Sequence, residues 1–202
     1  MTAPIRLYGS WTTNPQKARL ALEALELPYE WIEVDLLAGE NRRPAFGEIT
    51  PLRTVPVLDI DGVRLRQSGT ILAYLGDREG RLWPTTAAGR AQAMDLLFVE
   101  ASTFQLHAGT VFLNRGILPR IGKEGDSTRV AKAHKKMAPI LELLSDTLGD
   151  TDYLLGEFSV VDCAYGPWLP WLDLDTYPTL AAWRTRLSAR PEWSRCGVAV
   201  PD

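Results

Sequence analysis

Hydrophobic and polar residues alternate in two short stretches near the start of the chain, with a helical pattern between them. Ile5 to Tyr8 and Glu30 to Val34 each show the spacing that predicts a short strand. Between them, apolar residues recur at the spacing of one helix face: Ala18, Ala21, Leu22 and Leu25. We expect Asn14-Pro15 to open this helix, because Asn is a favoured N-cap and Pro fits the first turn. The pattern predicts a β-α-β unit with a right-handed parallel crossover.

A second pair of apolar runs predicts a hairpin followed by a helix. Val55 to Ile60 and Val63 to Arg66 flank Asp61-Gly62, a dipeptide typical of two-residue hairpin turns. Ser68 is expected to cap a short helix that ends near Leu75. The first part of the chain is therefore expected to be β-α-β followed by β-β-α.

The pattern becomes helical throughout after Gly76 to Gly89, a break that holds glycines, charges and a proline. Three apolar stripes at helical spacing follow: Met94, Leu97, Phe98 and Ala101; Met137, Ile140, Leu141, Leu144 and Leu148; and Leu180, Trp183 and Leu187. Ser159 and Asp162 are spaced like a capping box at the start of another helix. We expect an α/β domain over 1–76, a linker over 77–88 and an all-α domain over 89–202.

Composition and charge narrow the range of partners. The 202 residues are 46% hydrophobic and 23% charged, with a formal net charge of -3, as in an ordinary globular protein. The densest basic cluster, Lys132, Lys135 and Lys136, is interpreted as a solvated helix face, so no nucleic-acid partner is expected. No uninterrupted apolar run of membrane length and no signal-peptide pattern stand out. The sequence therefore predicts a cytoplasmic protein that does not bind membranes.

The cysteines and histidines predict neither a metal site nor a redox pair. Cys163 and Cys196 lie far apart and form no CxxC motif, and Cys163 is expected to be a buried free thiol. His107 and His134 lack the spacing of metal ligands, and no GxSxG is present. No bound metal is expected.

The stretch from Thr54 to Ser68 raises the first chemical hypothesis. Pro56 interrupts an apolar run, and a cis Val55-Pro56 bond would leave the Val55 backbone free to pair with an extended peptide. The alternative is an edge-strand proline without a ligand. Gln67 and Ser68 stand at the start of a helix, where free N–H groups attract an anion, so together they suit an α-amino acid head group. The alternative for Ser68 is an ordinary helix cap.

These features resemble the cytosolic glutathione transferase superfamily. The stretches that carry the resemblance are LYGSWTTNPQKARLALEALELPYE, TPLRTVPVLDIDG, RQSGTILAYL and YLLGEFSVVDCAYGPWL. The resemblance covers nearly the whole chain. It implies a thioredoxin-like N-terminal domain, an all-helical C-terminal domain and, as in most relatives, a homodimer.

The resemblance also implies a glutathione site. Val55 would pair with the cysteinyl backbone of glutathione, and Gln67 and Ser68 would hold its γ-glutamyl end. Arg42 stands where related enzymes often place a basic residue for the glycyl carboxylate. Thr54 replaces a Gln or Lys that is common at the neighbouring contact.

The residue that would stabilise the glutathione thiolate is sought in the loop after the first strand. Thr12 falls where theta-, zeta- and phi-like members carry Ser, and Thr12-Thr13-Asn14 matches the Thr-x-Asn spacing of the nu class, which has disulfide reductase activity. Tyr8 lies near the tyrosine of the alpha, mu and pi classes. Thr12 is therefore the expected catalytic residue, with Asn14 and Tyr8 as alternatives. Asn14 could instead be only a helix cap, and Tyr8 only a packing residue.

A pocket for the second substrate is expected between the domains. Its candidate lining residues come from the first C-terminal helix: Phe104, His107, Val111 and Phe112. Core packing is the alternative for the apolar members, and a surface position is the alternative for His107.

The sequence predicts a glutathione transferase that uses glutathione as co-substrate and attacks a small hydrophobic electrophile. Two other functions stay open. One is a glutathione-dependent disulfide reductase or lyase, and the other is a glutathione-binding or protein-interaction module without catalysis.

Overall fold

The computed structural model of the chain describes residues 4–198. The strands are β1 (Ile5–Gly9), β2 (Tyr29–Glu33), β3 (Val57–Ile60) and β4 (Val63–Leu65). The helices of the first part are α1 (Thr13–Ala24), α2 (Pro44–Ile49) and α3 (Ser68–Glu79). The helices that follow are α4 (Ala87–Val99), α5 (Gln105–Phe112), α6 (Leu118–Arg120), α7 (Ser127–Leu148), α8 (Val160–Tyr165), α9 (Pro178–Ser188) and α10 (Pro191–Cys196).

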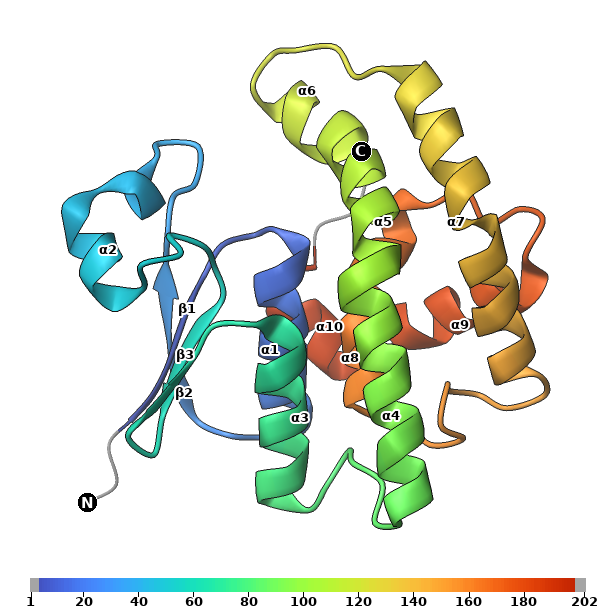
Figure 1. Cartoon of the computed structure of the whole chain (residues 1–202), viewed down its shortest axis with the longest axis horizontal. Helices are drawn as coiled ribbons and strands as arrows, with labels where there is room; N and C mark the ends of the chain where they lie inside the picture. Colours follow the sequence, from blue (N-terminus) through green and yellow to red (C-terminus); the bar gives the residue numbers. More distant parts are fainter. Residues whose placement is uncertain (1–3, 199–202) are drawn as a thin grey trace.

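The four strands form one mixed sheet in the order β2-β1-β3-β4. β1 pairs in parallel with β2, and β3 is antiparallel to both β1 and β4, which confirms the β-α-β and β-β-α units. Helices α1 and α3 cover one face of the sheet and lie between it and the helical part, and α2 lies on the other face (Figure 1). This is the thioredoxin-like arrangement, joined to a helical domain.

Alternation along β1 decides which side chains meet which face. Leu7 belongs to the main core with α1 and α3, whereas Tyr8 packs on the opposite side in a small cluster with Phe46 and Val57. Successive side chains of a strand point to opposite faces, so Tyr8 is turned away from α1.

Two predicted boundaries are wrong by a short distance. The N-cap of α1 is Thr12, and Asn14 lies inside the first turn. The Val55-Pro56 bond is cis, as predicted, but β3 begins at Val57, two residues after the start of the predicted run Val55 to Ile60. Pro56 lacks an N–H, which explains why the ladder with β1 starts at Val57.

A single long helical run, residues 87–120, carries α4, α5 and α6. It contains two π-helical turns, Glu100–Phe104 and Leu113–Ile117, where the hydrogen bonds widen from i→i+4 to i→i+5. Such turns shift the register of side chains on either side of them. The three stretches of α-helix therefore present different faces from those that a uniform helix would present.

The long helical run also bears on the expectation that no segment is long and apolar enough to span a membrane. It contains an 18-residue window with mean hydropathy 1.3, of which 39% is buried, so by length and composition alone it could cross a membrane. The test is weak evidence, because a core helix of a globular protein also passes it. Charged residues such as Asp95 and Glu100 stand within residues 87–120, which is why a search for an uninterrupted apolar run does not find this segment.

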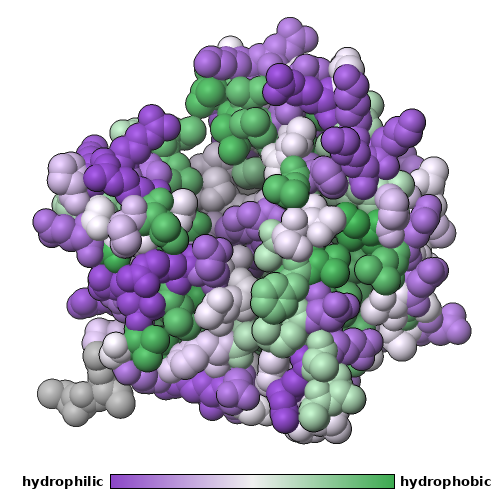
Figure 2. Space-filling model, in the orientation of Figure 1, coloured by the Kyte–Doolittle hydropathy of each residue, from purple (hydrophilic) through white to green (hydrophobic). Residues whose placement is uncertain are grey.

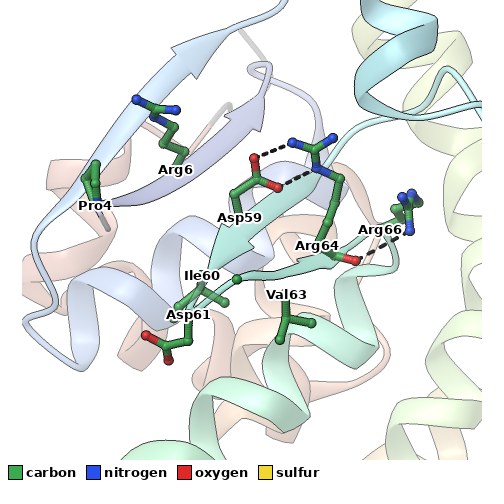
Figure 3. Close-up of a pocket in the computed structure, with 9 residues that line it drawn as sticks. Pro4, Arg6, Asp59, Ile60, Asp61, Val63, Arg64 and Arg66 are labelled. Carbon is green, nitrogen blue, oxygen red and sulfur yellow. Dashed lines mark hydrogen bonds and ion pairs between the residues drawn. The ribbon is translucent and has the colours of Figure 1, made fainter. Parts of the chain in front are cut away.

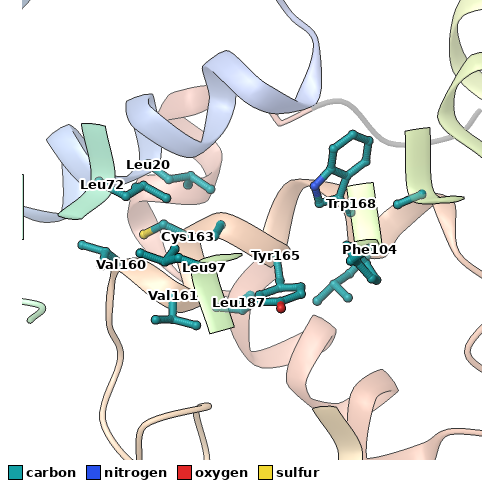
Figure 4. Close-up of a cluster of buried hydrophobic side chains, with 14 of the residues drawn as sticks. Leu20, Leu72, Leu97, Phe104, Val160, Val161, Cys163, Tyr165, Trp168 and Leu187 are labelled. Carbon is teal, nitrogen blue, oxygen red and sulfur yellow. The ribbon is translucent and has the colours of Figure 1, made fainter. Parts of the chain in front are cut away.

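The core of the helical part packs directly against α1 and α3. Figure 4 shows Leu20 and Leu72 from the first domain beside Cys163 and Val160 of α8. Both cysteines are free and buried, as expected for Cys163. The face of α1 and α3 that points away from the sheet is therefore buried by the second domain, and the sheet domain is not an isolated unit.

Asp162 anchors the start of α8 through the capping box that the sequence predicts. Its carboxylate accepts hydrogen bonds from the backbone and hydroxyl of Ser159, both 2.9 Å, from Leu154 N at 3.2 Å and from Trp183 Nε1 at 3.0 Å. Burial raises the pKa of Asp162 to about 6, and these donors oppose that rise.

Asp162→Asn tests this anchor. Asn keeps the shape but replaces one accepting oxygen by an NH₂ group, which leaves buried donors without a partner. Each such donor costs about 1–3 kcal/mol, so we expect the free energy of unfolding to fall by at least about 2 kcal/mol. Urea denaturation at pH 8, where the carboxylate is ionised, measures this. A variant as stable as the wild type would show that the capping box is dispensable.

Candidate functional site

Two hollows of similar size border the first domain, and the charges that line them differ. One, of about 430 Å³, lies at the edge of the sheet beside β4. Figure 3 shows that Arg64 there is paired with Asp59, through hydrogen bonds of 2.6 and 2.7 Å. These charges neutralise each other at the exposed edge of a sheet, where charged side chains discourage pairing with another strand. This hollow is therefore not the candidate site.

The other cavity, of about 500 Å³, lies between the first domain and the long helix. Its lining residues are Asn14, Thr54, Val55, Pro56, Arg66, Gln67, Ser68, Gly69, Thr70, Ala73, Met94, Leu97, Phe98, Ala101 and Gln105. Figure 2 shows apolar surface exposed over the part of the molecule that carries the long helix. The cavity thus has a polar wall from the first domain and a largely apolar wall from α4.

The start of α3 makes the polar wall a site for an anion. Gln67 is the N-cap of the helix but makes no side-chain cap, and the first helical N–H with a partner in the helix is that of Ile71. The N–H groups of Ser68, Gly69 and Thr70 have no partner within residues 4–198. Such N–H groups, together with the helix dipole, favour a negatively charged ligand.

Ser68 has a different position from the one predicted. It is the first residue of α3 rather than its cap, and its hydroxyl makes no hydrogen bond with the described residues. The side chain is largely buried and borders the cavity. A hydroxyl that the helix does not use is available to a ligand.

The segment before β3 offers backbone groups to the same cavity. Val55 lies outside the sheet ladder, and its N–H and C=O have no backbone partner in the described part of the chain. Thr54 and Val55 both line the cavity. The backbone is therefore free to pair with an extended ligand.

At its Asn14 end, the cavity lies next to the loop between β1 and α1. The Thr12 hydroxyl lies 2.8 Å from the Ser10 hydroxyl, and Thr12 does not line the cavity. Asn14, two residues further on, does line it.

A buried ion pair joins the two domains beneath this end of the cavity. Lys17 Nζ of α1 lies 2.6 Å from Glu100 Oε1, and the two side chains are 0% and 1% exposed. Trp168 Nε1 donates to the same oxygen at 2.8 Å, and its ring lies 4.9 Å from Nζ. Burial lowers the pKa of Lys17, and the Glu100 carboxylate opposes this. A buried pair of this kind is stable only because its remaining donors are also bonded.

The structure separates the predicted site residues into two groups. Five line the cavity: Asn14, Thr54, Val55, Gln67 and Ser68. The others do not: Thr12, Tyr8, Arg42, Phe104, His107, Val111 and Phe112.

The predicted residues outside the cavity have clear places in the fold. Arg42 is exposed, and its carbonyl accepts a hydrogen bond from Arg53. Phe104 and Val111 are fully buried, and Phe104 packs against Tyr165, so core packing accounts for both.

Two more predicted residues, His107 and Phe112, belong to α5. Phe112 is buried among aromatic rings, 5.0 Å from Trp171 and 5.5 Å from Trp11, measured between ring centroids. His107 is half-buried on α5.

Several lining residues were not predicted to form a site. Four of them could have been found from the sequence, because they stand at helical spacing: Met94, Leu97, Phe98 and Ala101. That spacing is equally typical of core packing, so it does not identify a site. No sequence pattern pointed to Gln105 or Arg66 as lining residues. Arg66 also borders the edge hollow, and its Nε is buried without a hydrogen-bond partner among the described residues.

Comparison with known proteins finds matches for both parts of the chain. Residues 11–78 match the domain described as Glutathione S-transferase, N-terminal domain, and residues 127–195 match the corresponding C-terminal domain. Glutathione S-transferase F9 of Arabidopsis thaliana is 25% identical over 202 residues, which cover 94% of each chain. The disulfide-bond oxidoreductase YfcG of Escherichia coli is 29% identical over 209 residues, which cover 93% of this chain and 91% of the relative.

A solved structure shows the same architecture. A glutathione transferase from Burkholderia graminis, with two glutathione molecules bound per subunit, has a TM-score of 0.84 at 25% identity and covers 96% of this chain and 87% of its own. Because both domains of one family are matched in order along a chain that its relatives cover almost completely, the chain belongs to the glutathione S-transferase family.

Proposed function

We propose that the protein is a glutathione transferase that activates the glutathione thiolate for attack on a small hydrophobic electrophile. The observation that carries this proposal is the character of the cavity lining. It combines the free N–H groups of α3 with an apolar wall, and none of its lining residues is Asp or Glu. Glutathione has two carboxylates and becomes more negative when its thiol ionises, so a lining rich in donors and without carboxylates suits it.

The tripeptide has a specific orientation in this proposal. Its γ-glutamyl carboxylate accepts from the N–H groups at the start of α3 and from Ser68, and its ammonium donates to the Gln67 amide oxygen. Its cysteinyl backbone pairs with Val55. Thr54 borders the glycyl end, whereas the exposed position of Arg42, outside the cavity, weakens the expectation that Arg42 holds the glycyl carboxylate.

The chemistry requires a thiolate that comes from the ligand rather than from the protein. Burial raises the pKa of Cys163 well above its usual value and that of Cys196 to about 12, so neither is a ready nucleophile. A free thiol has a pKa of about 8.5, and lowering it by two units requires about 2.7 kcal/mol. The thiolate then forms a C–S bond with the electrophile, and the leaving group departs with the electron pair of the bond that breaks.

The group that stabilises the thiolate belongs to the segment from the end of β1 to the first turn of α1. Thr12 is the first choice from the sequence, with Asn14 and Tyr8 as alternatives. Asn14 is favoured now because it borders the cavity, while the Thr12 hydroxyl is engaged with Ser10 and Tyr8 packs on the other face of the sheet. The electrophile would lie against Met94, Leu97, Phe98 and Ala101, rather than against Phe104, Val111 or Phe112.

Each of the proposed domains contributes one part of the site. Residues 1–76 hold glutathione and 89–202 provide the apolar wall, with 77–88 as the linker between them. α3 continues to Glu79, beyond the proposed boundary, so the flexible part of this linker would begin at Gly80.

A disulfide reductase is the second candidate. The likeness to a protein named as a disulfide-bond oxidoreductase and the Thr12-Thr13-Asn14 spacing favour it. In that reaction the thiolate attacks one sulfur of a disulfide, forms a mixed disulfide and releases the other sulfur as a thiolate. Parallel assays of conjugation to an aryl halide and of reduction of a glutathione mixed disulfide distinguish the two. Retention on immobilised glutathione with neither activity would indicate a binding module.

Ser68→Ala tests the γ-glutamyl site. Loss of a hydroxyl that meets a buried carboxylate should weaken glutathione binding by about 1–3 kcal/mol, measured by calorimetry. Ser127→Ala is the matched control, because Ser127 is also the first residue of its helix, α7, but lies outside the cavity. Equal affinities for wild type and Ser68→Ala would remove Ser68 from the site.

Three substitutions rank the candidates for the thiolate donor. Loss of one charge-assisted hydrogen bond should cost about 1.5–3 kcal/mol, or roughly ten- to a hundredfold in the rate of conjugation. We expect Asn14→Ala to show this loss, Thr12→Ala to show a smaller one and Tyr8→Phe to show almost none. If Tyr8→Phe abolishes turnover while the other two retain it, the assignment to this loop is wrong.

We also propose that the protein is a cytoplasmic homodimer. Phe98 and Leu106 on the long helix and Leu52 before β3 are each more than half exposed, at 64%, 65% and 56%. A partner subunit would cover such exposed apolar side chains if they lie on its contact surface.

Light scattering tests the dimer. The wild type should have twice the 22.5 kDa mass of the chain. Phe98→Glu should shift the measured mass towards that of one chain, because a charge would replace a ring that the proposed dimer interface buries. A wild-type mass of 22.5 kDa at micromolar concentration would contradict the proposal.

A further inference from the structure

Lys17 lies beneath the cavity and bonds to more than its ion-pair partner. Its Nζ donates to Glu100 Oε1 at 2.6 Å, to Asn14 Oδ1 at 2.7 Å and, more weakly, to Gln105 Oε1 at 3.5 Å. An ammonium has three N–H donors, so these three oxygens use all of them. Lys17 has no donor left for a ligand, and any effect on the cavity must pass through its partners.

The two amide partners are thereby fixed in one orientation. An ammonium can only donate, so the Asn14 and Gln105 oxygens must face Lys17 and their NH₂ groups must face away from it. Both residues line the cavity. Neither NH₂ group donates to any atom of residues 4–198. One buried cation therefore leaves two unpartnered amide donors at the cavity wall.

The π-helical turn explains how Gln105 reaches this position. In a regular α-helix, residues 100 and 105 would be about 140° apart around the axis, so only one of them could face Lys17. Here the Gln105 N–H bonds to the Glu100 carbonyl, an i→i+5 bond that brings the two side chains towards one side. The turn places a carboxylate and an amide over the same ammonium.

We propose that Lys17 is a positioning residue, which turns the Asn14 and Gln105 amides so that both NH₂ groups donate to the anionic sulfur of bound glutathione. This rests on the proposed function, and it adds Gln105, from the helical domain, to the loop residue as a second donor. The sulfur would thus be held by both domains. An amide whose oxygen accepts from a cation is a stronger donor at its nitrogen, because hydrogen bonds in a chain polarise one another.

Replacing each amide by its acid gives the sharpest test. In Asn14→Asp and Gln105→Glu the oxygen that faces Lys17 is kept, while the NH₂ group becomes a second, negatively charged oxygen. Lys17 keeps the new carboxylates ionised, so they cannot donate in place of the amide. Gln92→Glu, an exposed change on α4, is the matched control for added charge.

A double variant tests Lys17 itself. Lys17→Met with Glu100→Gln removes both charges together, which avoids leaving one charge buried and unpaired. The main readout is the thiol pKa of bound glutathione, which is obtained from the thiolate absorbance as the pH is raised. Glutathione affinity and the melting temperature are measured for the same variants. The other charged side chain at the cavity, Arg66, is unchanged in every variant.

We expect each acid variant to raise the bound thiol pKa by about one to two units, with a smaller rise in the double variant and none in Gln92→Glu. A role for Lys17 in stability alone would lower the melting temperature and leave the thiol pKa unchanged, which would overturn the proposal. So would wild-type thiol pKa values in both acid variants. If the wild type itself fails to bind glutathione, the proposed function fails instead.

Discussion

The ion pair between Lys17 and Glu100 is the interaction on which the Asn14 end of the cavity depends. It joins α1 of the thioredoxin-like domain to the long helix of the second domain, with both side chains almost fully buried. Removing two charges from water is costly, and the cost is offset only when every remaining donor and acceptor is bonded. Asn14, Gln105 and Trp168 supply those bonds. The pair therefore fixes the distance between the domains and the orientation of the polar groups around it.

The cavity is the product of two constraints that meet there. Pro56 cannot join the sheet ladder, so Val55 remains free beside the cavity, and α3 begins at Ser68 without a side-chain cap, so its N–H groups remain free too. Opposite them, the first stretch of the long helix contributes an apolar wall. The proposed ligand, glutathione, has an anionic end for the free N–H groups of α3 and an extended backbone for Val55.

Local patterns in the sequence were sufficient for the order of strands and helices, for the cis proline and for placing Gln67 and Ser68 near the start of α3, because each depends on neighbours along the chain. The Lys17–Glu100 contact spans 83 positions, and a lone Lys and a lone Glu give no sign of pairing. The π-helical turn at Glu100 is equally invisible to a search for helical spacing, so Gln105 was missed. Phe104 and Val111 show the reverse error: their spacing is that of a helix face, but the core on that side buries them.

The decisive measurement is a crystal structure of the protein with glutathione bound. We expect the γ-glutamyl carboxylate to meet the N–H groups at the start of α3, and the sulfur to lie within hydrogen-bond reach of the amide nitrogens of both Asn14 and Gln105. A sulfur bonded to Tyr8, or one that contacts neither amide while Lys17 and Glu100 remain paired, would contradict it.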